Sequence, residues 1–96
     1  MKITFNRTGG FIGAHDSVEI DTDSISEKER DEIYSAFETT KFLRKSSERG
    51  TGSDLFHYKI STEKVLEVDD NTSTARDLKP LIDLLMSKVQ STKESY

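Results

Sequence analysis

A single seven-residue stretch, Arg-Thr-Gly-Gly-Phe-Ile-Gly at positions 7–13, holds three of the five glycines of this 96-residue chain. It follows a short strand-like run at residues 2–5. Glycine is used where the backbone needs a positive φ or where another backbone comes close. The stretch therefore predicts a shaped loop that leaves a strand and presents an aromatic side chain, Phe11, and the charge of Arg7 to something outside the domain. The alternative is an ordinary turn in which Phe11 folds back into the core.

Alternating apolar and polar residues predict two pairs of strands. The first pair lies on either side of the glycine-rich stretch, at residues 3–5 and 18–20, and the second pair lies at residues 56–60 and 66–68. Strands with this period of two bury one face and leave the other face to solvent. The solvent face of the second pair is predicted to be polar, because it would carry His57, Lys59, Glu67 and Asp69.

Two helical patterns complete the predicted elements. The first opens with the capping box Ser26–Glu29, in which each side chain satisfies an amide of the first turn, and it should end near residues 39–40. Pro80 is tolerated only near the start of the second helix, so Asp77 is the expected N-cap there. The second helix shows the clearest periodicity of the chain, with apolar residues at Leu78, Leu81, Ile82, Leu85 and Val89.

These patterns give an α+β fold class with the order β-β-α-β-β-α. We expect a four-stranded, mostly antiparallel sheet with two helices on one face. Phe42 and Leu43, which leave the first helix, should pack under the sheet, and the polar segment 44–53 should form a mobile loop. The length suits a single domain at residues 1–90, followed by a frayed C-terminal tail at residues 91–96.

Composition and charge argue against several classes of function. The net charge is −4 and the basic residues are interleaved with acids, so we expect no nucleic-acid partner. There is no cysteine, and His15 and its neighbour Asp16 do not form a catalytic dyad, because adjacent side chains on an extended chain point apart. No metal-ligand spacing or phosphate loop is present, so we expect no enzymatic activity, no cofactor and no metal. Without a membrane-spanning run or a secretory signal pattern, we expect a cytoplasmic protein that does not bind membranes.

Three segments resemble the emfourin family of protealysin inhibitors. They read Met-Lys-Ile-Thr-Phe-Asn-Arg-Thr-Gly-Gly-Phe-Ile-Gly at positions 1–13, Asp-Leu-Phe-His-Tyr-Lys-Ile at 54–60, and Leu-Lys-Pro-Leu-Ile-Asp-Leu-Leu at 78–85. The pair at positions 42–43 also lies where the family has an aromatic-rich exit from its first helix. The resemblance implies a small cytoplasmic inhibitor of thermolysin-like M4 zinc metalloproteases, such as protealysin-like enzymes. We expect it to be a monomer when free.

An inhibitor of this kind would insert the glycine-rich loop into the protease cleft without chelating the zinc. The two apolar residues between the glycines would be the buried anchors. Arg7 would pair either with a carboxylate of the cleft or, within the chain, with Asp16 or Glu19. One loop buries too little area for a stable complex, so the neighbouring hairpin turn or residues 44–53 would also contribute. The predicted partner-binding residues are Arg7, Thr8, Gly9, Gly10, Phe11, Ile12, Gly13 and His15.

A second hypothesis is a non-inhibitory adaptor module of the same fold. Such a module would bind proteins through the open face of the sheet or through an exposed edge strand. The predicted polarity of the open face favours binding through loops over binding through this face.

Overall fold

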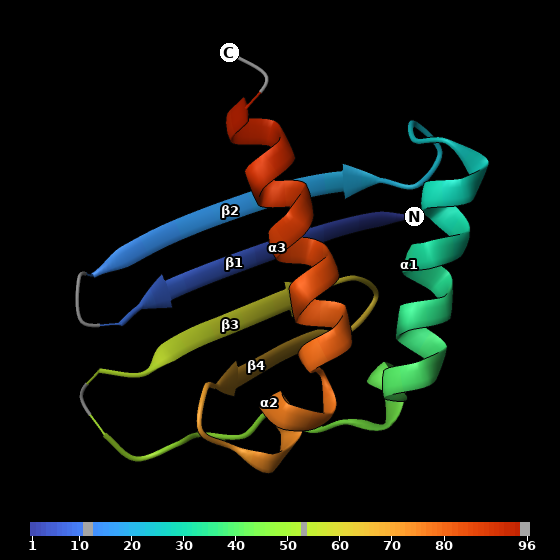
Figure 1. Ribbon diagram of the computed structural model, residues 1–96. Coiled ribbons are helices and arrows are strands. Elements are labelled where there is room, and N and C mark those ends of the chain that lie inside the picture. The colour runs from blue at the N-terminus through green and yellow to red at the C-terminus, as the bar shows by residue number, and fades with distance from the viewer. Residues whose placement is uncertain (11–12, 53, 95–96) are drawn as a thin grey trace.

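The computed structural model describes residues 1–10, 13–52 and 54–94. Within these residues the four strands form one antiparallel sheet in the order β2-β1-β3-β4. The helices α1 and α3 lie on one face of this sheet (Figure 1). The predicted α+β class and order of main elements are confirmed, with two short additional helices. The elements are β1 (Lys2–Gly9), β2 (Ala14–Asp21), α1 (Glu27–Thr40), the 3-10 helix η1 (Phe42–Arg44), β3 (Phe56–Ser61), β4 (Val65–Asp69), α2 (Ser73–Asp77) and α3 (Lys79–Glu94).

The core lies between the sheet and the two long helices. The strand register aligns inward-facing residues across the sheet, so that Phe5 of β1 lies opposite Val18 of β2 and Ile60 of β3. Burying each of the large apolar side chains contributes about 1.5–3 kcal/mol of transfer free energy to folding. This burial stabilises the packing of α3 against the strands. The large apolar side chains that are fully buried are Ile3, Phe5, Ile33, Phe42, Ile60, Leu66, Leu78, Leu81, Leu85, Val68 and Val89.

The start of α1 contains one of the two amide bonds of the capping box that the sequence predicts. Ser26 Oγ accepts a hydrogen bond from the Glu29 amide at 3.2 Å, and the same hydroxyl donates to Glu29 Oε1 at 3.2 Å. These bonds satisfy one of the amides that a helix leaves unpaired in its first turn.

The expected N-cap at Asp77 is wrong, because the chain forms the extra helix α2 before α3 begins. Thr72 caps α2 by accepting a hydrogen bond from the Ala75 amide at 3.2 Å. Asp77 is the last residue of α2, and its carboxylate accepts a hydrogen bond from Lys45 Nζ at 2.7 Å. Helix α3 then starts at Lys79, two residues after Asp77.

The chain leaves α1 through a left-handed residue. Lys41 has φ 55° and ψ 45°, and its amide donates to carbonyls of the last turn of the helix. After this turn the next two side chains differ in burial. Phe42 is 1% exposed, and its ring lies edge-to-face with that of Phe37, with 5.0 Å between the ring centroids. Leu43 is 73% exposed. The prediction that both residues pack under the sheet holds for Phe42 and is wrong for Leu43.

The segment 44–53, which we expected to be a mobile loop, is hydrogen-bonded to β4 around Glu48. The Glu48 amide donates to the Glu67 carbonyl at 3.0 Å, and the Asp69 amide donates to the Glu48 carbonyl at 3.0 Å. Glu48 thereby forms a parallel bridge with Val68. The backbone groups on the outer edge of β4 are therefore covered by the chain itself, and among the described strands only β2 has an open edge.

Helix α3 continues to Glu94, past residue 90, where we placed the domain boundary. The single domain at residues 1–90 and the frayed tail at residues 91–96 stay predictions. Within the part of the chain that the structure describes, no helix has the length and apolar character needed to cross a membrane.

The left-handed conformation of Lys41 gives a stability prediction. A residue with a Cβ is strained at this φ, whereas glycine is not, so Lys41→Gly should raise the free energy of unfolding by about 1 kcal/mol. Lys41→Ala, which removes the same charge but keeps the Cβ, should change it by less than about 0.5 kcal/mol. Urea denaturation of the three proteins measures both effects. Equal stabilities of the two variants would contradict the prediction.

Candidate functional site at the glycine-rich loop

The glycines of the loop all have the positive φ that the sequence predicts. The angle is +96° at Gly9, +76° at Gly10 and +64° at Gly13. A Cβ at Gly9 would lie 2.6 Å from the Leu55 carbonyl oxygen, and a Cβ at Gly10 would lie 2.6 Å from the ring of Phe56. A Cβ at Gly13 would meet nothing within 4 Å. Gly9 and Gly10 are therefore required for close packing as well as for φ, whereas Gly13 is required for φ alone.

The loop is fastened to the segment that enters β3. The Gly10 amide donates to the Leu55 carbonyl at 3.1 Å, and the Gly13 amide donates back to the Gly10 carbonyl at 3.2 Å. Both segments lie at the same end of the sheet, where β1 ends and β3 begins (Figure 1). We call this region the loop end and define it as residues 7–10, 13, 15 and 55–57.

Arg7 supports the loop end from the helix side of the sheet. Its Nε and Nη2 atoms donate to Asp16 Oδ2 at 3.1 and 2.5 Å, and its guanidinium lies 4.6 Å from the centroid of the Phe56 ring. The Asp16 side chain is 6% exposed and that of Arg7 is 23% exposed. Of the two pairings that the sequence left open for Arg7, the structure contains the one with Asp16. The pair joins facing residues of β1 and β2, so it helps to hold the end of the hairpin together.

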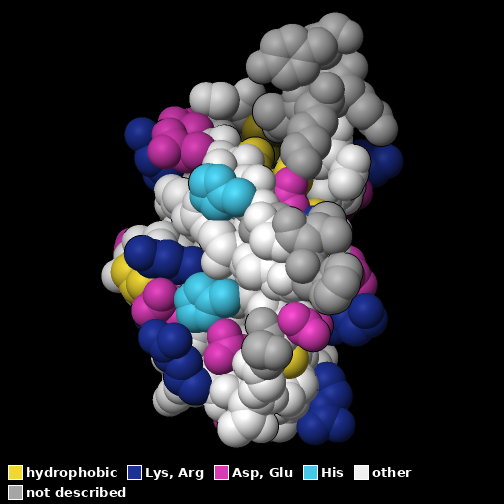
Figure 2. Space-filling model, turned by 90° about the vertical axis from the view of Figure 1, so that its left-hand side faces the viewer, with side chains coloured by type: hydrophobic (Ala, Val, Ile, Leu, Met, Phe, Trp, Pro, Cys, Tyr) yellow, Lys and Arg dark blue, Asp and Glu magenta, His cyan; other side chains and the backbone are white. Residues whose placement is uncertain are grey.

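The opposite face of the loop end carries both histidines. Thr8 of β1 lies between His15 of β2 and His57 of β3 in the strand register, and His57 in turn lies opposite Asp69 of β4. Figure 2, which views the molecule from the loop end, shows both histidine side chains on this side with acidic side chains near them. The four residues form one row across the sheet, which the sequence alone does not reveal because it requires the register.

Asp69 links this row to the segment that covers β4. His57 Nδ1 lies 2.7 Å from Asp69 Oδ1, and His57 Nε2 lies 3.3 Å from Glu67 Oε1. The Gly50 amide donates to the other carboxylate oxygen of Asp69 at 2.8 Å. The hydrogen bond with His57, helped by that from Gly50, lowers the pKa of the Asp69 carboxyl below its usual value of 3.8.

The two histidines do not belong to one cluster of side chains. His15 and His57 lie two strands apart, on either side of Thr8. Both ring nitrogens of His57 already face carboxylates. Among the residues that the structure describes, no three His, Asp or Glu side chains come together in a way that could hold a metal.

The structure positions most of the predicted binding residues but not the two anchors. Arg7, Gly9 and Gly10 are joined to the segment before β3 as described above, and His15 is exposed on β2. Phe11 and Ile12 lie outside the described residues, so the choice between anchor and core stays open for Phe11. Sequence reasoning missed Leu55 and Phe56 as the support of the loop.

The fold and the loop end are those of a small α+β protein in which glycines of the β1–β2 connection contact the start of β3. The model of the Emfourin family matches residues 5–86, which is most of the chain. The chain therefore belongs to the Emfourin family, as the resemblance of its three segments implies. Comparisons with curated proteins and with solved structures gave no match.

Gly10 and Gly13 of the loop end should respond differently to the same substitution. Gly10→Ala adds a clash with the Phe56 ring to the strain of a positive φ, so it should lower the free energy of unfolding by about 2–4 kcal/mol. Gly13→Ala meets no neighbour and should cost about 1 kcal/mol. Chemical denaturation of both variants measures the difference, and a Gly13→Ala variant as unstable as Gly10→Ala would show that the packing argument is wrong.

The lowered pKa of Asp69 predicts a pH dependence of stability. The carboxyl of Asp69 binds its proton less tightly in the folded protein than in the unfolded chain, so the ionised carboxyl stabilises the fold. This stabilisation is fully present above pH 3.8 and is lost as the pH falls through the lowered pKa of the folded state. At about pH 5, Asp69→Asn should cost about 1–3 kcal/mol, which is typical of hydrogen bonds to a charged group. That cost should shrink on going to about pH 2.5. Asp54→Asn, at an exposed position, is the control; a cost for Asp69→Asn that does not change with pH would refute the assignment.

Proposed function

We propose that the chain inhibits thermolysin-like (M4) zinc metalloproteases by occluding the active-site cleft with its glycine-rich loop, without chelating the zinc. Membership of the Emfourin family supports a protealysin-like protease as partner and a role other than catalysis. The observation that carries the proposed mechanism is the contact of Gly10 with Leu55 and Phe56, because it restrains the residue that directly precedes the two proposed anchors.

A loop that is already ordered loses less conformational entropy on binding. The Gly10–Leu55 hydrogen bond, the Gly13–Gly10 bond and the Arg7–Asp16 pair restrict both ends of the stretch that carries the two proposed anchors. Restricting a loop in its bound shape strengthens binding mainly by lowering this entropic cost. In this proposal Arg7 acts through the loop that it supports, with its partly exposed guanidinium at the margin of the contact.

The loop needs help from a neighbouring segment. A stable complex buries about 800 Å² on each partner, more than one short loop supplies. The contacts of Gly10 with Leu55 and Phe56 put the start of β3 next to the loop, so this part of the chain, together with the hairpin turn or residues 44–53, would complete the interface. The proposed partner-binding residues remain Arg7, Thr8, Gly9, Gly10, Phe11, Ile12, Gly13 and His15, in a monomeric cytoplasmic protein.

Titration of a thermolysin-like protease with the purified chain tests the proposal. We expect residual activity to fall linearly and to reach near zero at a stoichiometric amount of inhibitor. Isothermal titration of the chain alone with zinc tests the non-chelating mechanism and should give no binding. Full protease activity at large excess, or cleavage of the chain as a substrate, would refute inhibition.

Phe11→Ala tests the position of the anchor. If Phe11 fills a pocket of the protease, its removal should raise the inhibition constant about 30-fold or more, as for a binding hot spot, with little change in melting temperature. Leu43→Ala is a matched control, because Leu43 is 73% exposed and lies on η1, away from the loop. It should change inhibition by less than about threefold. A large fall in the melting temperature of Phe11→Ala would instead assign this residue to the core.

The adaptor hypothesis is favoured by one observation, the open edge of β2. Unpaired backbone groups on an edge strand can accept an extended segment of another protein. β2 is the terminal strand of the sheet, whereas the other terminal strand, β4, is covered around Glu48. If no M4 protease is inhibited, β2 is the surface on which to seek a partner.

A further inference from the structure

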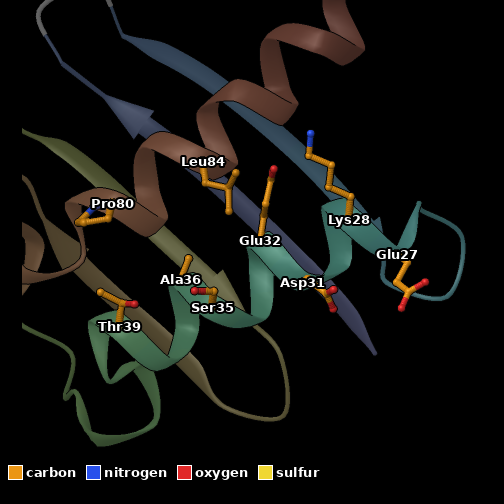
Figure 3. Close-up of a pocket in the computed structure, with 9 residues that line it drawn as sticks. All are labelled: Glu27, Lys28, Asp31, Glu32, Ser35, Ala36, Thr39, Pro80 and Leu84. Atoms are coloured by element: carbon orange, nitrogen blue, oxygen red, sulfur yellow. The ribbon is translucent and has the colours of Figure 1, made fainter.

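A groove runs between α1 and α3 on the helical layer. It is shallow and open to solvent, has a volume of about 860 Å³, and is lined by two helices that are far apart in the sequence. Figure 3 shows Ala36 and Glu32 of α1 pointing toward Leu84 of α3, with Pro80 at one end of the space between the helices. The lining residues are Glu27, Lys28, Asp31, Glu32, Ser35, Ala36, Thr39, Pro80 and Leu84.

The floor of the groove is apolar and its rim is acidic. Ala36 and Leu84 are half-buried and pack against the core from the groove side. The α1 side of the groove carries three carboxylates, from Glu27, Asp31 and Glu32, and one lysine, Lys28. The groove thus combines an apolar contact surface with excess negative charge.

These three carboxylates differ from other acids of the same helical layer. Glu29 is paired with Lys88, and Asp83 lies 3.9 Å from Lys79, so both have cations close by. Among the described residues, none forms an ion pair with Glu27, Asp31 or Glu32, although Lys28 lies within the same stretch of α1. Their charge is therefore available to a partner.

We propose that this groove docks a cationic amphipathic segment of a second protein, one that places an apolar side chain over Ala36 and Leu84 and Lys or Arg side chains against the acidic rim. Apolar contact between the helices would supply most of the affinity, as it does for helices that bind in grooves. The unpaired carboxylates would select a basic partner and speed its association. The groove lies on the helical layer, so the proposal does not depend on protease inhibition at the loop end.

Calorimetric titration with a defined probe tests this proposal. The probe is a 14-residue peptide with Leu and Lys at helical spacing, about four turns long, and its Lys→Glu counterpart is the negative control. We expect the basic peptide to bind, the acidic peptide not to bind, and the affinity to fall as salt is raised, since salt screens exposed charges. Failure of the basic peptide to bind at low salt would overturn the proposal.

Charge-reversal variants locate the binding. Asp31→Lys with Glu32→Lys should weaken the basic peptide about tenfold or more, because two exposed attractive charges become repulsive. Glu38→Lys makes the same kind of change at an exposed position of α1 outside the groove, so it should leave the affinity within about twofold. Equal losses in both variants would mean that only the net charge matters, which would overturn the proposed site.

Sedimentation of the free protein tests the remaining alternative, in which a second copy of this chain occupies the groove. A concentration-dependent dimer that disappears in the Asp31→Lys, Glu32→Lys variant would show that a second copy of this chain occupies the groove, and would overturn the assignment to a basic partner. A monomer at all concentrations, together with binding of the basic peptide, supports it. Protease inhibition measured on the same variants should not change, so failure of one proposal leaves the other testable.

Discussion

The alternation of side chains along β1 is the constraint on which both the core and the loop end depend. β1 is paired on both sides, with β2 and with β3, so its register fixes the positions of three strands. Ile3 and Phe5 point into the core, and Arg7, next on the same face, meets Asp16 and Phe56. A slip of one residue would turn all three side chains to the other face. The hydrophobic pattern that stabilises the sheet therefore also builds the support beneath the loop.

Sequence reasoning succeeded for the strands and for the start of α1, where the evidence was local. The period of two located the strands, and the capping box at Ser26 located the start of α1, because each pattern depends on residues within one turn or one strand. It failed where distant contacts decide. The segment around Glu48 lies on β4 because of backbone hydrogen bonds to Glu67 and Asp69, about twenty residues later, which no local pattern shows. One failure was local: Asp77 was expected to cap α3, but Thr72 caps the short helix α2 first, and Asp77 is the last residue of α2.

At the loop end, too, the sequence predicted local features but not the contacts between distant segments. Adjacent glycines predicted positive φ, but only the β1–β3 register reveals that Leu55 and Phe56 lie against them. The contact between Arg7 and Asp16 could have been predicted from the sequence. If Phe5 pairs with Val18 across the hairpin, as their alternation suggests, then two residues further along each strand brings Arg7 opposite Asp16. Opposite charges that face each other across a predicted hairpin indicate an ion pair.

The two sides of the sheet differ in whether another strand can be added. The chain closes the β4 side with its own backbone around Glu48, and it leaves the β2 side available. A protein with two open edges can polymerise without end by strand pairing, but one with a single open edge can form at most a closed pair of sheets, because the pair uses up both available edges. The short bridge at Glu48 therefore occupies backbone groups of Glu67 and Asp69 that another strand would need for pairing at this edge.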